Sequence, residues 1–203
     1  MHKNVFLLII LVAIMPNIVG CEDDDFAPYT KYEKELDVSI GSYPTSIDDV
    51  TDEVTQIAQA YQDGVKLTNA KVVLEGSAQI DSGKGIILFD FYKEHETKNQ
   101  ITRVLLEYSM ITNKVDKIKF EQGHGKRVGG YSNPINKELG KMPFSELINN
   151  LHQDVGFQEK AMIPNPRIEI DYTSEINIYL YDNDKNDGPI YRKKLESISS
   201  ATK

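Results

Sequence analysis

The sequence predicts an α+β fold in which an antiparallel sheet carries two helices packed on one face. Two segments repeat apolar residues at helical spacing, one starting at Val50 and the other at Phe144. Other segments alternate apolar and polar residues and are joined by short turns, which indicates antiparallel strands. Because a helix followed by strands occurs twice, the order of elements also fits a duplicated helix-meander unit.

Residues 1–20 are expected to be a signal peptide. The run Val5–Met15 is apolar without interruption. It is too short to cross a bilayer as a helix, which takes about 20 apolar residues. It has the length of the apolar region of a signal peptide, so we expect the segment to be removed.

Ile18, Val19 and Gly20 come directly before Cys21, and this order resembles the lipobox of bacterial lipoproteins. The resemblance implies cleavage after Gly20 and a diacylglyceryl group on the Cys21 thiol. The protein would then be anchored in a cell membrane or outer membrane and would face the periplasm or the exterior. Each buried CH2 contributes about 0.8 kcal/mol, so two or more acyl chains hold firmly. The alternative is a buried core cysteine.

Cys21 is the only cysteine, so its acylation leaves no thiol for a disulfide, a metal site or a nucleophile. The acidic residues 22–25 follow it directly. They are either a solvated spacer or, by the same resemblance, the signal that sends lipoproteins to the outer surface of some Gram-negative bacteria. Residues 21–45 as a whole are charged and have little periodicity, which predicts a lipidated acidic tether.

The charge balance argues against nucleic-acid binding. The chain has 23 basic and 31 acidic side chains and a net charge of -8. Removal of Lys3 with the signal peptide leaves 22 basic side chains and a net charge of -9. Phosphate backbones and anionic lipid surfaces both require a basic face, so we expect the membrane contact to be made by the lipid.

Residues 46–121 predict a helix followed by four antiparallel strands. Ser46 is expected to cap the helix, which Gly64 ends. The helix has an apolar stripe formed by Val50, Val54, Ile57, Ala58 and Tyr61. The four strands are predicted over 70–80, 86–92, 104–110 and 118–120.

The same region, 46–121, is similar in outline to PepSY-type domains of secreted and envelope proteins. The likeness lies in a helix followed by a meander and in the strand-turn-strand segment EYSMITNKVDKIKFE. It implies a non-catalytic interaction or inhibitory module.

Residues 122–142 predict a glycine-rich loop, and loops of this length are usually functional or linkers. Its basic part contains His124, Lys126 and Arg127, and backbone N–H groups in such loops can hold anions. These three residues are candidates for binding an anionic or protein partner. The alternative is a surface loop without a ligand.

Residues 143–198 predict a second helix and a long β-hairpin. Pro143 is expected at the first helical position, and Phe144, Leu147, Ile148 and Leu151 form the apolar stripe. Residues 168–180 alternate throughout, which predicts one long strand with a bulge at Ser174, paired with 190–195.

The turn at 182–188 is rich in oxygen ligands. Asp182, Asp184 and Asp187 are candidates for calcium binding, although the segment lacks the Gly and the Glu that an EF-hand places at its sixth and twelfth positions. The alternative is a hairpin turn that selects Asp and Asn for their conformational preferences.

These observations together predict a cell-envelope lipoprotein that binds a protein and is not an enzyme, such as an inhibitor or immunity factor. No cofactor is expected. The first alternative is an envelope protein that binds a small ligand or calcium, and the second is a hydrolase without a recognisable motif.

Overall fold

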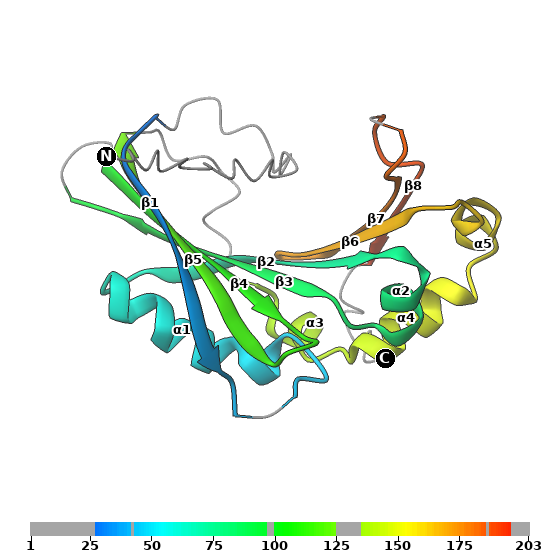
Figure 1. Cartoon of the computed structure of the whole chain (residues 1–203), viewed down its shortest axis with the longest axis horizontal. Helices are drawn as coiled ribbons and strands as arrows, with labels where there is room; N and C mark the ends of the chain where they lie inside the picture. The colour runs from blue at the N-terminus through cyan, green and yellow to red at the C-terminus, as the bar shows by residue number, and fades with distance from the viewer. Residues whose placement is uncertain (1–26, 42, 97–99, 125–134, 186, 196–203) are drawn as a thin grey trace, which may run out of the picture.

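The computed structural model describes residues 27–41, 43–96, 100–124, 135–185 and 187–195, and it confirms the α+β class. The strands form one eight-stranded sheet in the order β1-β5-β4-β3-β2-β6-β7-β8, and every neighbouring pair is antiparallel. Five helices accompany this sheet in the described part of the chain (Figure 1).

The strands are β1 (Ala27–Ser39), β2 (Lys66–Glu75), β3 (Ile86–Glu94), β4 (Gln100–Ser109), β5 (Lys114–His124), β6 (Pro166–Tyr172), β7 (Ile176–Asp182) and β8 (Tyr191–Leu195). The helices are α1 (Asp48–Tyr61), α2 (Gly76–Ser82), α3 (Lys137–Gly140), α4 (Phe144–His152) and α5 (Val155–Ala161).

The sheet has an apolar face that packs on the helices. Alternate strand residues such as Val72, Phe89 and Ile170 join Val54 of α1 and Leu147 of α4 in a single buried cluster. Figure 1 shows α1, α3 and α4 on the same side of the sheet. This single core extends across both of the predicted units.

The opposite face of the sheet is polar, and no helix of the described part lies on it (Figure 1). We call it the charged face. Several residues of opposite charge are register partners on this face, such as Lys71 and Asp171. The ionic residues of the face are Lys31, Glu33, Glu35, Lys71, Asp90, Arg103, Glu107, Lys117, Lys119, Glu121, Arg167, Glu169 and Asp171.

The sheet is continuous because β2 pairs with β3 on one side and with β6 on the other. The hairpin formed by β6 and β7 therefore extends the first sheet instead of building a second one. The structure does not confirm a duplicated helix-meander unit.

The prediction of a tether over 21–45 is wrong for residues 27–39, which form β1. This strand pairs with β5 at the edge of the sheet. Most of its side chains are exposed on both faces, so the alternation that marks a half-buried strand is absent from its sequence.

The prediction of a strand over 70–80 is also wrong beyond Glu75. Gly76 has a φ of 74°, which ends the strand, and residues 76–82 form α2. Gly83 closes this helix in the left-handed conformation, with a φ of 63°. A helix of two turns is too short to show a helical period clearly, whereas Ala78 and Ile80 happen to continue the alternation of β2.

The segment 168–180 is a hairpin of two strands, β6 and β7, and Ser174 lies in the turn between them and not in a bulge. Three residues separate Tyr172 from Ile176, which pair directly. Because the number of residues between these two partners is odd, the alternation of apolar and polar residues continues through the turn without a break. The sequence pattern of this hairpin is therefore identical to that of one long strand.

The two predicted helices form, with changes at their starts. The stripes are confirmed, since Val50, Val54 and Ala58 in α1 and all four predicted residues of α4 are buried. Ser46 does not cap α1 through its side chain; instead the Asp49 carboxylate accepts hydrogen bonds from the Thr45 and Ser46 N–H groups. Pro143 is the N-cap of α4 and not its first residue.

The predicted loop 122–142 is shorter than expected, because β5 continues to His124 and residues 137–140 form α3. Helix α5 was not predicted from the sequence.

Candidate functional site

Three features of the described residues bear on function: two ion-pair clusters on the charged face and the exposed edge of β1.

The first cluster surrounds Lys71 at the centre of the sheet. Its Nζ lies 3.1 Å from Oε2 of Glu169 and 3.5 Å from Oδ1 of Asp171, both on the neighbouring strand β6. The Lys71 side chain is 12% exposed and that of Glu169 is 14% exposed. Register explains the contact, because Lys71 is directly opposite Asp171 and two residues from the partner of Glu169.

The electrostatics of this cluster favour a permanent ion pair. Burial acts to lower the pKa of Lys71, but Asp171 and Glu169 outweigh it, so the pKa is raised overall. Burial raises the pKa of Asp171, an effect that Lys71 only partly offsets. Because Lys71 stays protonated at neutral pH, it is a poor general base or nucleophile.

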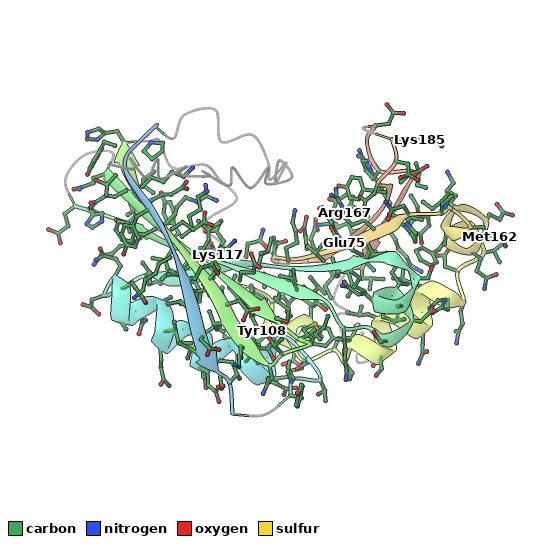
Figure 2. The ribbon with its side chains drawn as sticks, in the orientation of Figure 1. Glu75, Tyr108, Lys117, Met162, Arg167 and Lys185 are labelled. Atoms are coloured by element: carbon green, nitrogen blue, oxygen red, sulfur yellow. The ribbon has the colours of Figure 1, made fainter. Side chains whose placement is uncertain are left out.

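Arg167 extends this cluster toward β7. Its Nη2 lies 3.2 Å from Oε1 of Glu169, and its guanidinium carbon lies 4.7 Å from the centre of the Tyr181 ring. Glu75 is its register partner on β2, and Figure 2 shows both residues on the charged face, away from Tyr108.

The second cluster lies on β3, β4 and β5. Arg103 Nη2 is 2.7 Å from Asp90 Oδ2, and Lys119 Nζ is 2.9 Å from Oε1 of Glu121, which is nearly buried. Lys117, labelled in Figure 2, pairs with Glu33 of β1 at 3.3 Å. The Arg103–Asp90 and Lys117–Glu33 pairs join neighbouring strands, whereas Lys119 and Glu121 both belong to β5. Cross-strand pairs contribute roughly 0.2–1 kcal/mol each, so both clusters stabilise the sheet.

The third feature is the β1 edge, defined by the exposed side chains of Tyr29, Tyr32 and Val38. Tyr29 is 54% exposed and Val38 is 38% exposed. Within the described residues β1 pairs only with β5, so its second side has no strand partner there. In the part of the chain that the structure describes, seven large hydrophobic residues are exposed, and four of them, these three and Tyr43, lie within 29–43.

The β1 edge is held firmly by contacts with its neighbour. Tyr32 stacks on Phe120 with ring centres 5.1 Å apart. The Gln100 amide donates to the Tyr29 hydroxyl at 2.6 Å, and the Tyr29 ring lies 5.3 Å from that of His124. Exposed aromatic side chains on a fixed strand are typical of protein interfaces.

The residues predicted from the sequence do not meet in one place. His124 is the exposed last residue of β5, next to Tyr29. Lys126 and Arg127 lie outside the described residues, as do Gly20 and Cys21. The binding loop and the lipid site therefore stay predictions.

Of the predicted calcium residues, Asp182 is the last residue of β7, and Asp184 and Asp187 follow it in the turn. The Asp182 carboxylate accepts from the Asp184 N–H at 3.2 Å and pairs with Lys185 Nζ at 3.0 Å, and these contacts lower its pKa. Where the structure describes the chain, no group of three or more His, Cys, Asp or Glu side chains is arranged to hold a metal. Calcium binding by Asp182, Asp184 and Asp187 stays a prediction.

The helices of the described segments include none that is long and apolar enough to span a membrane. Sequence reasoning missed the β1 edge and the Lys71 cluster. The tyrosines at 29 and 32 were the available signal for the edge, but their strand has no apolar alternation.

No protein-family model, curated protein or solved structure matches this chain. The class that the structure itself defines is an α+β protein with one antiparallel sheet and helices on its apolar face.

Proposed function

We propose that the chain is a cell-envelope lipoprotein, anchored through acylated Cys21, that works as a non-catalytic protein-binding module. The observation that carries the binding role is the β1 edge, a strand of 13 residues at the border of the sheet with exposed tyrosines. An inhibitor or immunity factor for an exported enzyme or toxin would act in this way.

An edge strand can bind a partner by adding that partner's strand to the sheet. The main-chain hydrogen bonds then supply affinity, and alternate side chains supply specificity. Long edges are normally protected against pairing with copies of the same chain by charged residues. β1 carries Lys31, Glu33, Lys34 and Glu35 in sequence, which disfavours random pairing and leaves Tyr29 and Val38 at its ends for a specific contact.

The charged face supports binding more than catalysis. Its carboxylates and cations form ion pairs with one another, both across strands and within β5, and the central Lys71 remains protonated.

The lipid anchor is tested by intact-mass analysis of protein purified from a bacterial host that acylates lipoproteins. We expect a mass that corresponds to residues 21–203 with added acyl chains. The Cys21→Ala variant, which should keep its signal peptide, is the control. Retention of Met1, or a free sulfhydryl at Cys21, would contradict the proposal.

The binding role is tested by comparing two double variants in pull-downs from envelope extract. Tyr29→Lys with Val38→Lys changes the β1 edge, and Lys is a natural residue of edge strands. Val155→Lys with Met162→Lys is the matched control, because those residues are 66% and 86% exposed on and just after α5. We expect only the first variant to lose the partner, and equal recovery by both would contradict binding through β1.

A further inference from the structure

We propose that one end of the sheet faces the membrane that holds the lipid and that the opposite end points away from it. This inference rests on the proposed acylation of Cys21. The membrane-facing end, here the proximal end, is defined by Ala27, Gln100 and His124, which are register partners. The distal end is defined by Ser39, Ser109 and Lys114, which are also partners.

The length of the connection to β1 limits how far the proximal end can move from the bilayer. Cys21 and Ala27 are six residues apart, and β1 begins at Ala27. A fully extended chain spans at most about 3.3–3.6 Å per residue, so this connection cannot be longer than about 20 Å. The proximal end therefore stays within about 20 Å of the acylated residue.

The distal end is much farther away along the same strand. β1 has 13 residues and rises about 3.3 Å per residue, so its two ends are about 40 Å apart. Figure 1 shows β1 starting beside the last residues of β5 and running down toward α1. An upright molecule thus presents the proximal end to the membrane and holds the start of α1 farther out, whereas Asp63, just after α1, lies back against Lys93.

The charges oppose the alternative in which the molecule lies on its helices. α1 exposes Asp48, Asp49, Asp52 and Glu53, and the segment 48–63 contains no Lys or Arg. An anionic lipid surface repels such a helix.

The proximal end has a different composition. The charged residues near it by register or in the chain next to it are Lys31, Lys93, Arg103, Glu94, Glu96 and Glu121, and their charges balance. Tyr29 adds an exposed aromatic ring, and Tyr is a residue that is favoured at membrane interfaces. The acidic residues 22–25 stay close to acylated Cys21 in either orientation, so they do not distinguish the two, and the folded part of the proximal end is repelled less than the acidic start of α1.

The orientation gives the β1 edge a direction. The strand begins close to the bilayer and extends outward, so a partner strand added to it would also run along the membrane normal. Val38 would be presented far from the lipid and Tyr29 close to it.

The test uses the acylated full-length chain in vesicles that contain phosphatidylethanolamine, phosphatidylglycerol and a lipid with a nitroxide on its headgroup. Acylated Cys21 has no free thiol, so one introduced cysteine can be labelled with a fluorophore selectively. Glu96→Cys reports on the proximal end, Thr112→Cys on the distal end and Met162→Cys on the segment after α5. All three positions are exposed.

We expect nitroxide quenching at residue 96 to be at least about threefold stronger than at residue 112, because β4 alone separates these positions by about 30 Å. Insertion of about 12 Gly and Ser residues before Ala27 should remove most of this difference, because such a linker adds about 20 Å of average reach.

Mass analysis of the same samples separates the two proposals. Equal quenching at 96 and 112 in acylated protein would overturn the orientation and leave the anchor standing. A difference that survives the linker insertion would overturn the claim that the short connection to β1 imposes the orientation. Unmodified Cys21 would overturn the anchor and the orientation together.

Discussion

Two buried tyrosines show how a single hydroxyl group affects this core. Tyr108 donates a hydrogen bond to Asn113 Oδ1 at 2.7 Å, whereas the Tyr172 hydroxyl has no hydrogen-bond partner among the residues that the structure describes. Burial raises the pKa of both, that of Tyr108 to about 12. Neither phenol ionises near neutral pH, so hydrogen bonding alone distinguishes them.

We therefore predict opposite effects for two identical chemical changes. Tyr172→Phe should leave the free energy of unfolding unchanged or raise it by about 1 kcal/mol, because an unpaired buried hydroxyl is removed. Tyr108→Phe should lower it by about 1 kcal/mol, since the Asn113 acceptor loses its donor. Urea denaturation of both variants measures the difference. A larger loss in Tyr172→Phe than in Tyr108→Phe would show that the hydroxyl at 172 has a partner.

At the scale of elements, the junction between α2 and β3 requires a glycine. A Cβ at Gly85 would lie 2.1 Å from the Val73 carbonyl oxygen, which belongs to the backbone of β2 and cannot move aside. The Gly85 carbonyl also accepts from the Met110 N–H at 2.9 Å, which fixes the position of the residue.

Gly85→Ala should therefore lower the free energy of unfolding by about 1–3 kcal/mol, the usual cost of forcing extra volume into a packed site. Gly188→Ala is the matched control, because no atom lies within 4 Å of a Cβ there. Thermal unfolding followed by circular dichroism measures both variants. Equal midpoints for the two would mean that the chain at Gly85 can shift to make room.

A second junction joins α5 to β8 through Asp154. Its carboxylate accepts from Lys193 Nζ at 2.8 Å and caps α5 by accepting from the Phe157 N–H at 3.1 Å. The bonds from Lys193, Tyr191 and Phe157 lower the pKa of Asp154 from 3.8 to about 2.

This shift makes part of the stability depend on pH. A carboxylate with a lowered folded-state pKa stabilises the protein above its unfolded value, and the contribution is lost as the pH falls from about 4 to about 2. Asp154→Asn keeps a capping side chain but removes the charge. We expect a lower melting temperature than wild type at pH 7 and a smaller difference near pH 2. A difference that does not change with pH would contradict a role for the charge.

At the scale of the whole molecule, the sheet and its single core predict one cooperative unit. β2 is bonded to β3 and to β6, and buried residues of both halves belong to the same cluster. A separate second domain would need its own core.

We predict a single unfolding transition in urea, with coincident curves from circular dichroism and tyrosine fluorescence. Hydrogen exchange should give the same opening free energy for the most protected amides of β4 and of β6. Two separated midpoints, or a β6–β8 region that exchanges at a much lower free energy, would indicate two units.

The sequence alone was sufficient where a face is defined locally. The spacing of apolar residues such as Val54, Leu147 and Leu106 predicts the buried stripes of α1 and α4 and the meander of β3, β4 and β5. Each spacing places the apolar side chains on one side of its helix or strand, and that side is the buried one. The segment before Cys21 that resembles a lipobox is likewise local, and the lipid anchor that it implies is a proposal from the sequence alone.

Only the tertiary structure decided which strands are neighbours. β1 pairs with β5, some 85 residues later, and β6 pairs with β2 through backbone hydrogen bonds that leave little trace in side-chain identity. The hairpin at Ser174 and the strand over 27–39 were hidden for the same reason, since period and composition do not encode pairing. The β1 edge therefore became a candidate binding surface only through the tertiary structure of the sheet.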